Sequence, residues 1–267
     1  MEFSRTKIIC TIGPATSSMP MLRNLYNNGM NVVRINMSHA THNFANSVIE
    51  KVKKINSDPK SKHGSIGVLL DTQGPEIRTG DTEVPLDLKV GDEVTLTVRD
   101  EVDVETSSIK INYKDLIHSV SKGSKITVDN GLINFSVISK DEETLLCKVI
   151  DGGKLGSKRH VNLPGVRVNL PSITSKDVED INFGIENDVD FIALSFVRNK
   201  EDLEELQKIL DEKKSPAKII AKIENQEGLD NIHDICQASW GVMVARGDLG
   251  IETSLVDLPN IQRRIMY

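Results

Sequence analysis

Two apolar segments near the C-terminal end of the sequence stop on charged residues suited to phosphate and metal chemistry. One segment ends on Lys222 and Glu224, and the other ends on Arg246 and Asp248. The residues between them have the length and pattern of a helix, so the segments are expected to be neighbouring parallel strands. Two carboxylates beside two cations would form a divalent-metal site of the kind that phosphoryl transfer needs.

Simpler structural explanations exist for these four residues. A carboxylate at the end of a strand often caps the helix that follows it. Lys222 and Glu224 could also form a structural ion pair. Their spacing of two residues, however, places both side chains on the same face of a strand, which favours a shared site.

The apolar segments alternate with segments of helical pattern. Strands are predicted at residues 7–12, 31–36, 66–71, 190–196, 218–223 and 241–245. Helices are predicted at residues 21–28, 42–56, 199–212, 228–237 and 258–267, and residues 172–177 carry helix-start signals. Strands separated by helices of this length indicate βαβ units and a parallel sheet covered on both faces.

Helical periodicity is almost absent between residues 78 and 163. Short β-rich segments at 93–98, 125–129, 133–138 and 145–150 are separated there by turn residues. We predict an α/β protein with an incomplete (β/α)8-type TIM barrel and an inserted small all-β barrel domain. The predicted domains are residues 1–75, the first part of the barrel; 76–165, the insertion; and 166–267, the continuation of the barrel. Six strands are fewer than the eight of a closed barrel, so the sequence is expected to stop before closure.

Residues that could bind ligands, most of them polar, follow each strand of the predicted barrel. Besides the two segments described first, they are Thr11 and Pro14; Arg34, Asn36, Ser38 and His39; Asp71, Thr72, Glu76 and Arg78; and Ser195, Phe196 and Arg198. In a β/α barrel these strand ends meet on one face, where active sites form. Their repeated occurrence therefore predicts a single site.

Taken singly, several of these residues have explanations that need no ligand. Arg34 or Arg78 alone would more often be a solvated surface charge, and Asn36 and Ser38 fit a helix cap. His39 and His42 hint at a metal, but without a third ligand a cap or a nucleotide contact is favoured.

Composition narrows the class of protein. The 267 residues include 33 Lys and Arg against 39 Asp and Glu, a formal net charge of −6. This mild acidity gives no support to nucleic-acid or membrane partners, and no apolar run is long enough to span a bilayer. The N-terminal residues lack the apolar core of a signal peptide. Cys10, Cys147 and Cys236 lie far apart in or beside apolar runs, which predicts reduced core thiols in a cytoplasmic protein.

Six motifs, in the right order, resemble those of the pyruvate kinase family. They are ICTIGP at 9–14, MNVVRINMSH at 30–39, LDTQGPEIRTG at 70–80, NLPG at 162–165, KIENQEG at 222–228 and MVARGDLG at 243–250. The resemblance covers residues 6–267, and the predicted insertion lies where that family has its mobile lid. It implies transfer of the phosphoryl group of phosphoenolpyruvate to ADP, giving pyruvate and ATP in the last step of glycolysis.

The resemblance also implies a role for each site residue. Lys222 and Arg34 are the implied catalytic residues, and the implied substrate-binding residues are Arg34, Lys222, Ser195, Gly247 and Asp248. Glu224 and Asp248 would hold Mg²⁺ (or Mn²⁺), and Asn36, Ser38, Asp71 and Thr72 would hold K⁺. The implied nucleotide-binding residues are Thr11, Pro14, Asn36, His39, Arg78 and Arg159, with Asp129 reaching in from the lid. Glu76 stands where Glu goes with dependence on K⁺ in this family, so activity is expected to need K⁺.

The sequence departs from the family pattern at several positions. Arg159 replaces a nucleotide-binding Lys, His160 replaces a Gly, and Trp240 replaces an Asp and is expected to pack at the bottom of the barrel. The family also has two more barrel strands, a Thr of the proton-delivery step, and a C-terminal domain that binds effectors and helps build a homotetramer. Because these parts are not found in this sequence, we expect the polypeptide alone to be poorly soluble or partly molten, with little or no turnover. A sharp thermal transition together with normal pyruvate formation would overturn this expectation.

Two other classes of function stay open at the level of sequence. One is a non-catalytic remnant that binds nucleotide or phosphoenolpyruvate. The other is a different Mg²⁺-dependent barrel, such as a lyase or aldolase, acting on phosphoenolpyruvate or keto acids. The predicted insertion, with the DTQGPEIR motif of residues 71–78 leading into it, argues against the second class.

Overall fold

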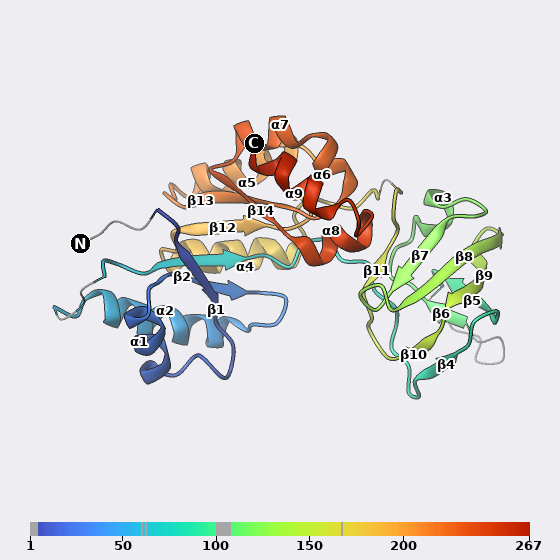
Figure 1. Ribbon diagram of the computed structural model, residues 1–267, viewed down its shortest axis with the longest axis horizontal. Coiled ribbons are helices and arrows are strands. Elements are labelled where there is room, and N and C mark those ends of the chain that lie inside the picture. The colour runs from blue at the N-terminus through green and yellow to red at the C-terminus, as the bar shows by residue number, and fades with distance from the viewer. Residues whose placement is uncertain (1–4, 60, 62, 100–107, 167) are drawn as a thin grey trace. The chain divides into compact units, whose positions relative to one another are not determined.

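The structure is a computed structural model that describes residues 5–59, 61, 63–99, 108–166 and 168–267 (Figure 1). Its contacts divide the chain into two compact units. The first, called the α/β unit, comprises Met1–Gly74, Ser172–Ile223 and Asn231–Met243. The second, called the β-rich unit, comprises Pro75–Pro171, Glu224–Asp230 and Val244–Tyr267. The domain boundaries predicted from the sequence remain a prediction.

A parallel six-stranded sheet forms the centre of the α/β fold. Its strands lie in chain order: β1 (Ile8–Thr11), β2 (Met30–Asn36), β3 (Gly67–Asp71), β12 (Phe191–Leu194), β13 (Lys218–Ile223) and β14 (Gly241–Val244). The register pairs Thr11 with Arg34, Asn36 with Asp71, and Asp71 with Ala193. The carboxyl ends of these strands therefore lie side by side, as the sequence predicted.

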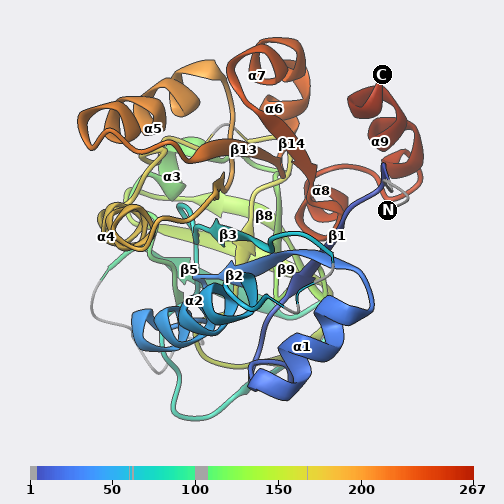
Figure 2. The ribbon, with the colours of Figure 1, turned by 90° about the vertical axis from the view of Figure 1, so that its left-hand side faces the viewer.

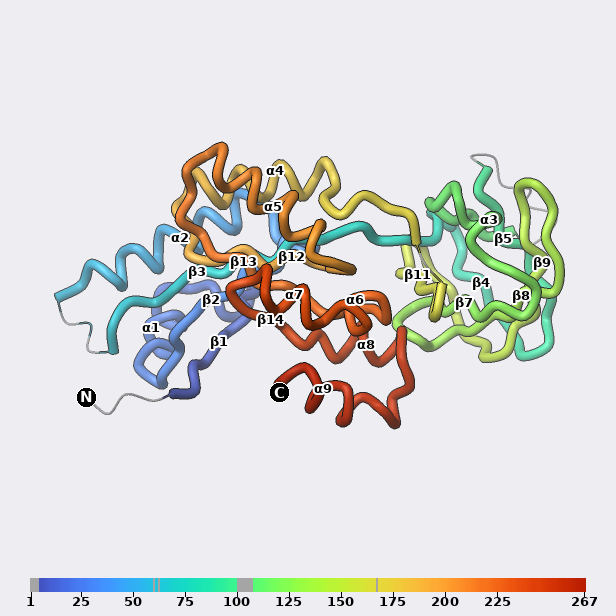
Figure 3. Tube along the Cα trace, turned by 90° about the horizontal axis from the view of Figure 1, so that it is seen from above, coloured from blue at the N-terminus to red at the C-terminus, as the bar shows by residue number. Residues whose placement is uncertain are grey.

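Helices with an apolar stripe cover this sheet. They are α1 (Met19–Asn27), α2 (His42–Asn56), α4 (Ser175–Glu186), α5 (Lys200–Glu212) and α7 (Ile232–Ala238). Figures 2 and 3 show α2, α4 and α5 along the same side of the curled sheet. The side chains of Ser18, Thr41, Thr174 and Asn199 cap the first four of these helices by accepting hydrogen bonds from backbone N–H groups. The alternation of strand and helix makes this part an incomplete β/α barrel.

The helix predicted at residues 228–237 is two helices in the structure, α6 (Gln226–Asp230) and α7. Asn231 separates them with a φ of −96° and a ψ of 13°. Its side-chain amide donates a 2.8 Å hydrogen bond to the carbonyl oxygen of Arg198. This tertiary contact, which the local sequence does not show, accompanies the break.

The β-rich unit contains a separate β domain. Its larger sheet has the order β11–β7–β8–β9–β5–β6, and its smaller sheet pairs β10 with β4. The bounds are β4 (Leu86–Leu88), β5 (Glu93–Thr97), β6 (Ser108–Lys110), β7 (Lys125–Val128), β8 (Ile133–Lys140), β9 (Thr144–Asp151), β10 (Gly153–Leu155) and β11 (Val161–Asn162). A core that includes Leu96, Phe135 and Leu145 holds it together. The unit also contains the single-turn helix α3 (Leu116–Ser119), α6, α8 (Arg246–Glu252) and α9 (Leu258–Met266).

The cysteine prediction is confirmed in part. All three cysteines are free thiols, and Cys147 is buried, but Cys10 is half-buried and Cys236 is exposed. The prediction of a core thiol is wrong for Cys236, because the buried position of α7 is the preceding residue, Ile235, and successive helix residues point in different directions. Trp240 is 64% exposed and rests against Phe191 with ring centroids 5.2 Å apart.

Candidate active site

A buried cluster of charged and hydroxyl side chains lies at the carboxyl ends of β2, β3, β12 and β13. Asp71, the last residue of β3, is fully buried. Its Oδ2 atom accepts a 2.7 Å hydrogen bond from Nε of Arg34 and a second, shorter contact from Nη2. Nζ of Lys222 lies 3.1 Å from Oδ1 of Asp71. The buried carboxylate of Asp71 is thus paired with two cations. An unpaired charge would be strongly unfavourable in such surroundings of low dielectric constant.

One oxygen of Asp71 retains capacity for a further ligand. Within the described part of the chain, its Oδ1 atom accepts no hydrogen bond of good geometry. The 3.1 Å approach of Lys222 is therefore an ion pair without hydrogen-bond alignment. A buried carboxylate oxygen with an open lone pair suits a hard cation.

Lys222 is held from a second side by Ser195. The side chain of Lys222 donates a 2.7 Å hydrogen bond to Oγ of Ser195, and this Oγ donates a 2.7 Å hydrogen bond to the carbonyl oxygen of Thr72. The backbone N–H of Ser195 in turn donates to Oγ1 of Thr72 at 3.1 Å, and this hydroxyl donates to the carbonyl oxygen of Ala193 at 3.2 Å. These bonds connect the ends of β3, β12 and β13.

The turn after β2 lies beside the same cluster. Oδ1 of Asn36 accepts a 3.0 Å hydrogen bond from the backbone N–H of Ser38. The backbone N–H of Met37 donates to the carbonyl oxygen of Asp71 at 2.9 Å. The structure therefore brings Asn36, Ser38, Asp71 and Thr72 together, with oxygen atoms from two adjacent strand ends.

Residues after β1 extend this arrangement toward solvent. Nη1 of Arg34 donates a 2.9 Å hydrogen bond to Oγ1 of Thr11. Pro14 lies in the following turn, and His39 is exposed in the turn after β2. Thr11 thus joins the cluster through Arg34, and the backbone N–H of His39 donates a 3.2 Å hydrogen bond to the carbonyl oxygen of Asn36. Among the bonds that the structure shows for the described residues, none connects Pro14 to the cluster.

The hint of a metal at His39 and His42 finds no support. Nε2 of His42 lies 2.7 Å from Oδ1 of Asp180, and its ring stacks on Phe183. Among the described residues, no group of three or more His, Cys, Asp and Glu side chains is placed to hold a metal. His42 therefore fixes helix α2 against α4.

The predicted magnesium ligands Glu224 and Asp248, and Gly247, a predicted substrate-binding residue, belong to the β-rich unit. Glu224 follows β13 and is 1% exposed. Asp248 lies half-buried in the first turn of α8, and Gly247 beside it is exposed. A Cβ atom at Gly247 would meet nothing within 4 Å. Open space next to this backbone leaves room for a ligand.

The arginines predicted to bind nucleotide are paired with carboxylates. Nε of Arg78 donates to Oε2 of Glu76 at 2.8 Å, and Nη1 of Arg78 donates to the carbonyl oxygen of Lys158 at 2.8 Å. Arg159 is exposed, and its Nη1 lies 3.4 Å from Oδ1 of Asp129. The long Arg159 pair is the weaker of the two.

Sequence reasoning did not identify Glu252, one turn after Asp248 on α8. Nδ2 of Asn162 donates a 2.9 Å hydrogen bond to Oε1 of Glu252. The pKa of Glu252 is raised above its ordinary value, mainly by burial and also by the Asp248 carboxylate, and the hydrogen bond from Asn162 opposes this increase. The spacing of four residues places Asp248 and Glu252 on one helix face, so the sequence alone could have identified Glu252 as a neighbour of Asp248.

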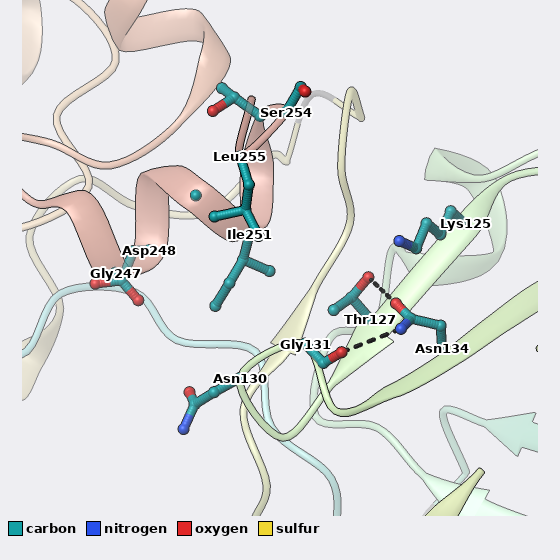
Figure 4. A pocket seen from close by; sticks show the side chains of 12 residues that line it. Lys125, Thr127, Asn130, Gly131, Asn134, Gly247, Asp248, Ile251, Ser254 and Leu255 are labelled. Atoms are coloured by element: carbon teal, nitrogen blue, oxygen red, sulfur yellow. Dashed lines mark hydrogen bonds between the residues drawn. The ribbon is translucent and has the colours of Figure 1, made fainter. Parts of the chain in front are cut away.

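A pocket of about 620 Å³ opens between α8 and the strands β7 and β8 of the same unit. Figure 4 shows Asp248 and Leu255 on one wall and Lys125, Thr127 and Asn134 on the other. Thr127 donates a 2.8 Å hydrogen bond to Oδ1 of Asn134, and Nδ2 of Asn134 donates to the carbonyl oxygen of Gly131 at 3.1 Å. The pocket therefore presents Lys125 and Asp248 as its charged groups.

The α/β architecture and the cationic cluster at the strand ends define a β/α-barrel protein with a polar site at the carboxyl face of its sheet. The family model described as "Pyruvate kinase, barrel domain" matches residues 3–267. The chain belongs to the pyruvate kinase family.

Curated relatives agree with this assignment. "Plastidial pyruvate kinase 2" of Arabidopsis thaliana is 44% identical over 262 residues, which is 98% of this chain and 45% of the relative. "Pyruvate kinase" of Staphylococcus epidermidis is 45% identical over 265 residues, with the same shares of 98% and 45%. "Pyruvate kinase" of Staphylococcus aureus is 44% identical over 265 residues, again 98% of this chain and 45% of the relative. The chain thus spans somewhat less than half the length of these relatives.

Proposed function

We propose that the chain carries the phosphoryl-transfer site of a pyruvate kinase, which moves the phosphoryl group of phosphoenolpyruvate to ADP. The single observation that supports this most directly is the placement of Lys222, whose ammonium group is fixed by Asp71 and Ser195 at the face where strand ends meet. A fixed cation there can stabilise the negative charge that spreads over a transferring phosphoryl group.

In the proposed reaction, the bond between phosphorus and the enol oxygen of phosphoenolpyruvate breaks. A bond forms between phosphorus and a terminal oxygen of ADP, and the released enolpyruvate takes up a proton at its methylene carbon. Lys222 would contact the oxygens of the phosphoryl group, and Arg34 would neutralise the phosphate. Because Asp71 is fully buried and holds both cations, neither side chain must reorganise when charge develops.

The residues present fit the metal ions that such chemistry uses. The open lone pair of Asp71, with the oxygens of Asn36, Ser38 and Thr72, supplies hard donors for K⁺. Glu224 and Asp248 would hold Mg²⁺ or Mn²⁺, because magnesium is commonly bound through one or two carboxylates and substrate phosphates. When bound, these ions neutralise phosphate charge and orient the substrate.

The remaining assignments are proposals of the same kind. Ser195, Gly247 and Asp248 would bind substrate, and Thr11, Pro14, Asn36, His39, Arg78 and Arg159 would bind nucleotide. The pairing of Arg78 with Glu76 means that nucleotide would have to compete with a carboxylate. We also propose a cytoplasmic location, which the three free thiols support. Within the described residues, none of the helices has the length and apolar character needed to cross a membrane.

Titration calorimetry with phosphoenolpyruvate tests this function, with a coupled assay of pyruvate formation beside it. Binding is the primary measurement because the chain spans 45% of the length of the relatives it matches. The proposal predicts saturable binding that needs Mg²⁺ and is stronger in K⁺ than in Na⁺. Phosphoenolpyruvate binding that needs neither Mg²⁺ nor K⁺ would favour a non-catalytic binding module, and the absence of both binding and pyruvate formation would contradict the proposal.

A further inference from the structure

The hydroxyl group of Ser195 is buried and is held by two hydrogen bonds. Ser195 is 2% exposed, and its Oγ atom already accepts one hydrogen bond and donates another. Its hydroxyl proton is directed to the carbonyl oxygen of Thr72, so a lone pair is left facing Lys222. This orientation suits an ammonium donor, which has three protons and no acceptor.

The backbone around Ser195 is held in a conformation that fixes this hydroxyl. The next residue, Phe196, has a φ of +55°, a region that bulky side chains rarely adopt. Gly74 packs directly against the turn, since a Cβ atom at Gly74 would lie 2.7 Å from Cβ of Ser195 and 2.9 Å from Cδ2 of Phe196.

Gly74 is itself anchored. Its backbone N–H donates a 3.0 Å hydrogen bond to Oδ1 of Asp177, a fully buried residue of α4. Asp177 also closes the capping box of that helix with Thr174. The position of the Ser195 hydroxyl is thus determined by contacts from α4, β3 and β12, and not by Lys222 alone.

From this geometry we infer that Ser195 is a positioning residue that holds the Lys222 ammonium group in place for the proposed phosphoryl transfer. Asp71 supplies charge to Lys222 without hydrogen-bond alignment. Ser195 supplies an aligned acceptor, at 2.7 Å, that constrains the direction of the Lys222 ammonium group. This inference rests on the proposed function and changes the role of Ser195 from substrate contact to support of the lysine.

Competitive acetylation of lysines with trace acetic anhydride, read by peptide mass spectrometry, tests the inference without any need for turnover. The reactivity of Lys222 is measured relative to Lys218, an exposed lysine of the same strand, in the full chain without substrate. In the unaltered protein Lys222 should react at least about tenfold more slowly than Lys218, the order of effect of one hydrogen bond to a charged group. Equal reactivity would overturn the inference with no variant required.

Ser195→Ala should then raise the relative reactivity of Lys222 about tenfold, and Ser195→Cys, which keeps a weaker acceptor, should raise it less. Ser172→Ala is the matched control, because Ser172 is also buried in the α/β unit but donates to Glu205; it should leave the ratio unchanged. A Ser195→Ala protein that is folded by circular dichroism and retains the ratio of the unaltered protein would refute the positioning role.

The same labelling separates this inference from the proposed function. Phosphoenolpyruvate with Mg²⁺ should protect Lys222 from acetylation if Lys222 contacts the phosphoryl group. If phosphoenolpyruvate fails to protect Lys222 but Ser195→Ala still raises the reactivity of Lys222, the positioning contact exists and the proposed function is wrong. If Ser195 instead bound substrate directly, Ser195→Ala would weaken phosphoenolpyruvate binding and leave the acetylation of free Lys222 unchanged.

Discussion

Gly74 offers the sharpest test of how the cluster is built, because its substitution by alanine has two separable costs. Its φ of +75° is unfavourable for any residue with a Cβ atom, at about 1–2 kcal/mol. The new Cβ would also meet Cβ of Ser195 at 2.7 Å and Cδ2 of Phe196 at 2.9 Å. Overpacking of this kind typically costs about 1–3 kcal/mol. We therefore expect Gly74→Ala to lower the free energy of unfolding by about 2–5 kcal/mol, the sum of the two terms.

Gly64→Ala is the matched control. Gly64 has a φ of +80° in the same unit, but a Cβ atom there would meet nothing within 4 Å. Its cost should be the backbone term alone, about 1–2 kcal/mol. The difference between the two variants isolates the close approach of Gly74 to Ser195 and Phe196.

Urea unfolding followed by tryptophan fluorescence measures both variants. Trp240 is the only tryptophan of the chain and belongs to the α/β unit that contains Gly64 and Gly74. Its contact with Phe191 makes its emission sensitive to loss of the sheet. Equal losses of stability in Gly74→Ala and Gly64→Ala would refute the reasoning that Gly74 is required by the Ser195 turn.

Three further outcomes follow from charge and burial. Asp71→Asn should destabilise the α/β unit by about 3–5 kcal/mol in urea unfolding, because Arg34 and Lys222 lose their shared buried counter-charge; a loss below 1 kcal/mol would contradict this. Burial raises the pKa of the Cys147 thiol from 9.0 to about 12, so its contribution to stability is complete below pH 9 and is lost as the pH rises toward 12. In the native protein a thiol reagent should accordingly modify exposed Cys236 before Cys147, and the reverse order would be evidence against this burial. Burial lowers the pKa of His160 from 6.5, although the carboxylates of Glu76 and Asp248 oppose this shift. The contribution of His160 to the free energy of unfolding is therefore present above pH 6.5 and is lost as the pH falls toward the pKa of the folded state. His160→Gln should accordingly flatten the pH dependence of stability below pH 6.5.

Elements with a complete local signal were predicted closely from the sequence. Helix α2 has the predicted bounds of 42–56, because Thr41 caps it and its apolar residues recur on one face. Strand β13 likewise matches the predicted 218–223. The strands β4, β6 and β10 have only three residues each, too few to show a period, and they were not predicted.

The composition of the cluster followed from the sequence, but its connections did not. Parallel strands in chain order bring Asn36, Asp71 and Ser195 together at one edge. The bond between Ser195 and Lys222 joins residues 27 positions apart, and its geometry depends on the turns at Gly74 and Phe196. Neither turn has a periodic signal, so the pairing became visible only in three dimensions.

Calorimetric titration of phosphoenolpyruvate into Lys222→Met and Lys218→Met, with Mg²⁺ and K⁺ present, tests the central claim most directly. Both changes remove an ammonium group from β13, but Lys218 is exposed and lies outside the cluster. If Lys222 contacts the phosphoryl group, Lys222→Met should weaken binding at least about tenfold, the loss expected for a hydrogen bond to a charged group, and Lys218→Met should bind as the unaltered protein does. Equal affinity of the two variants for phosphoenolpyruvate would contradict the account.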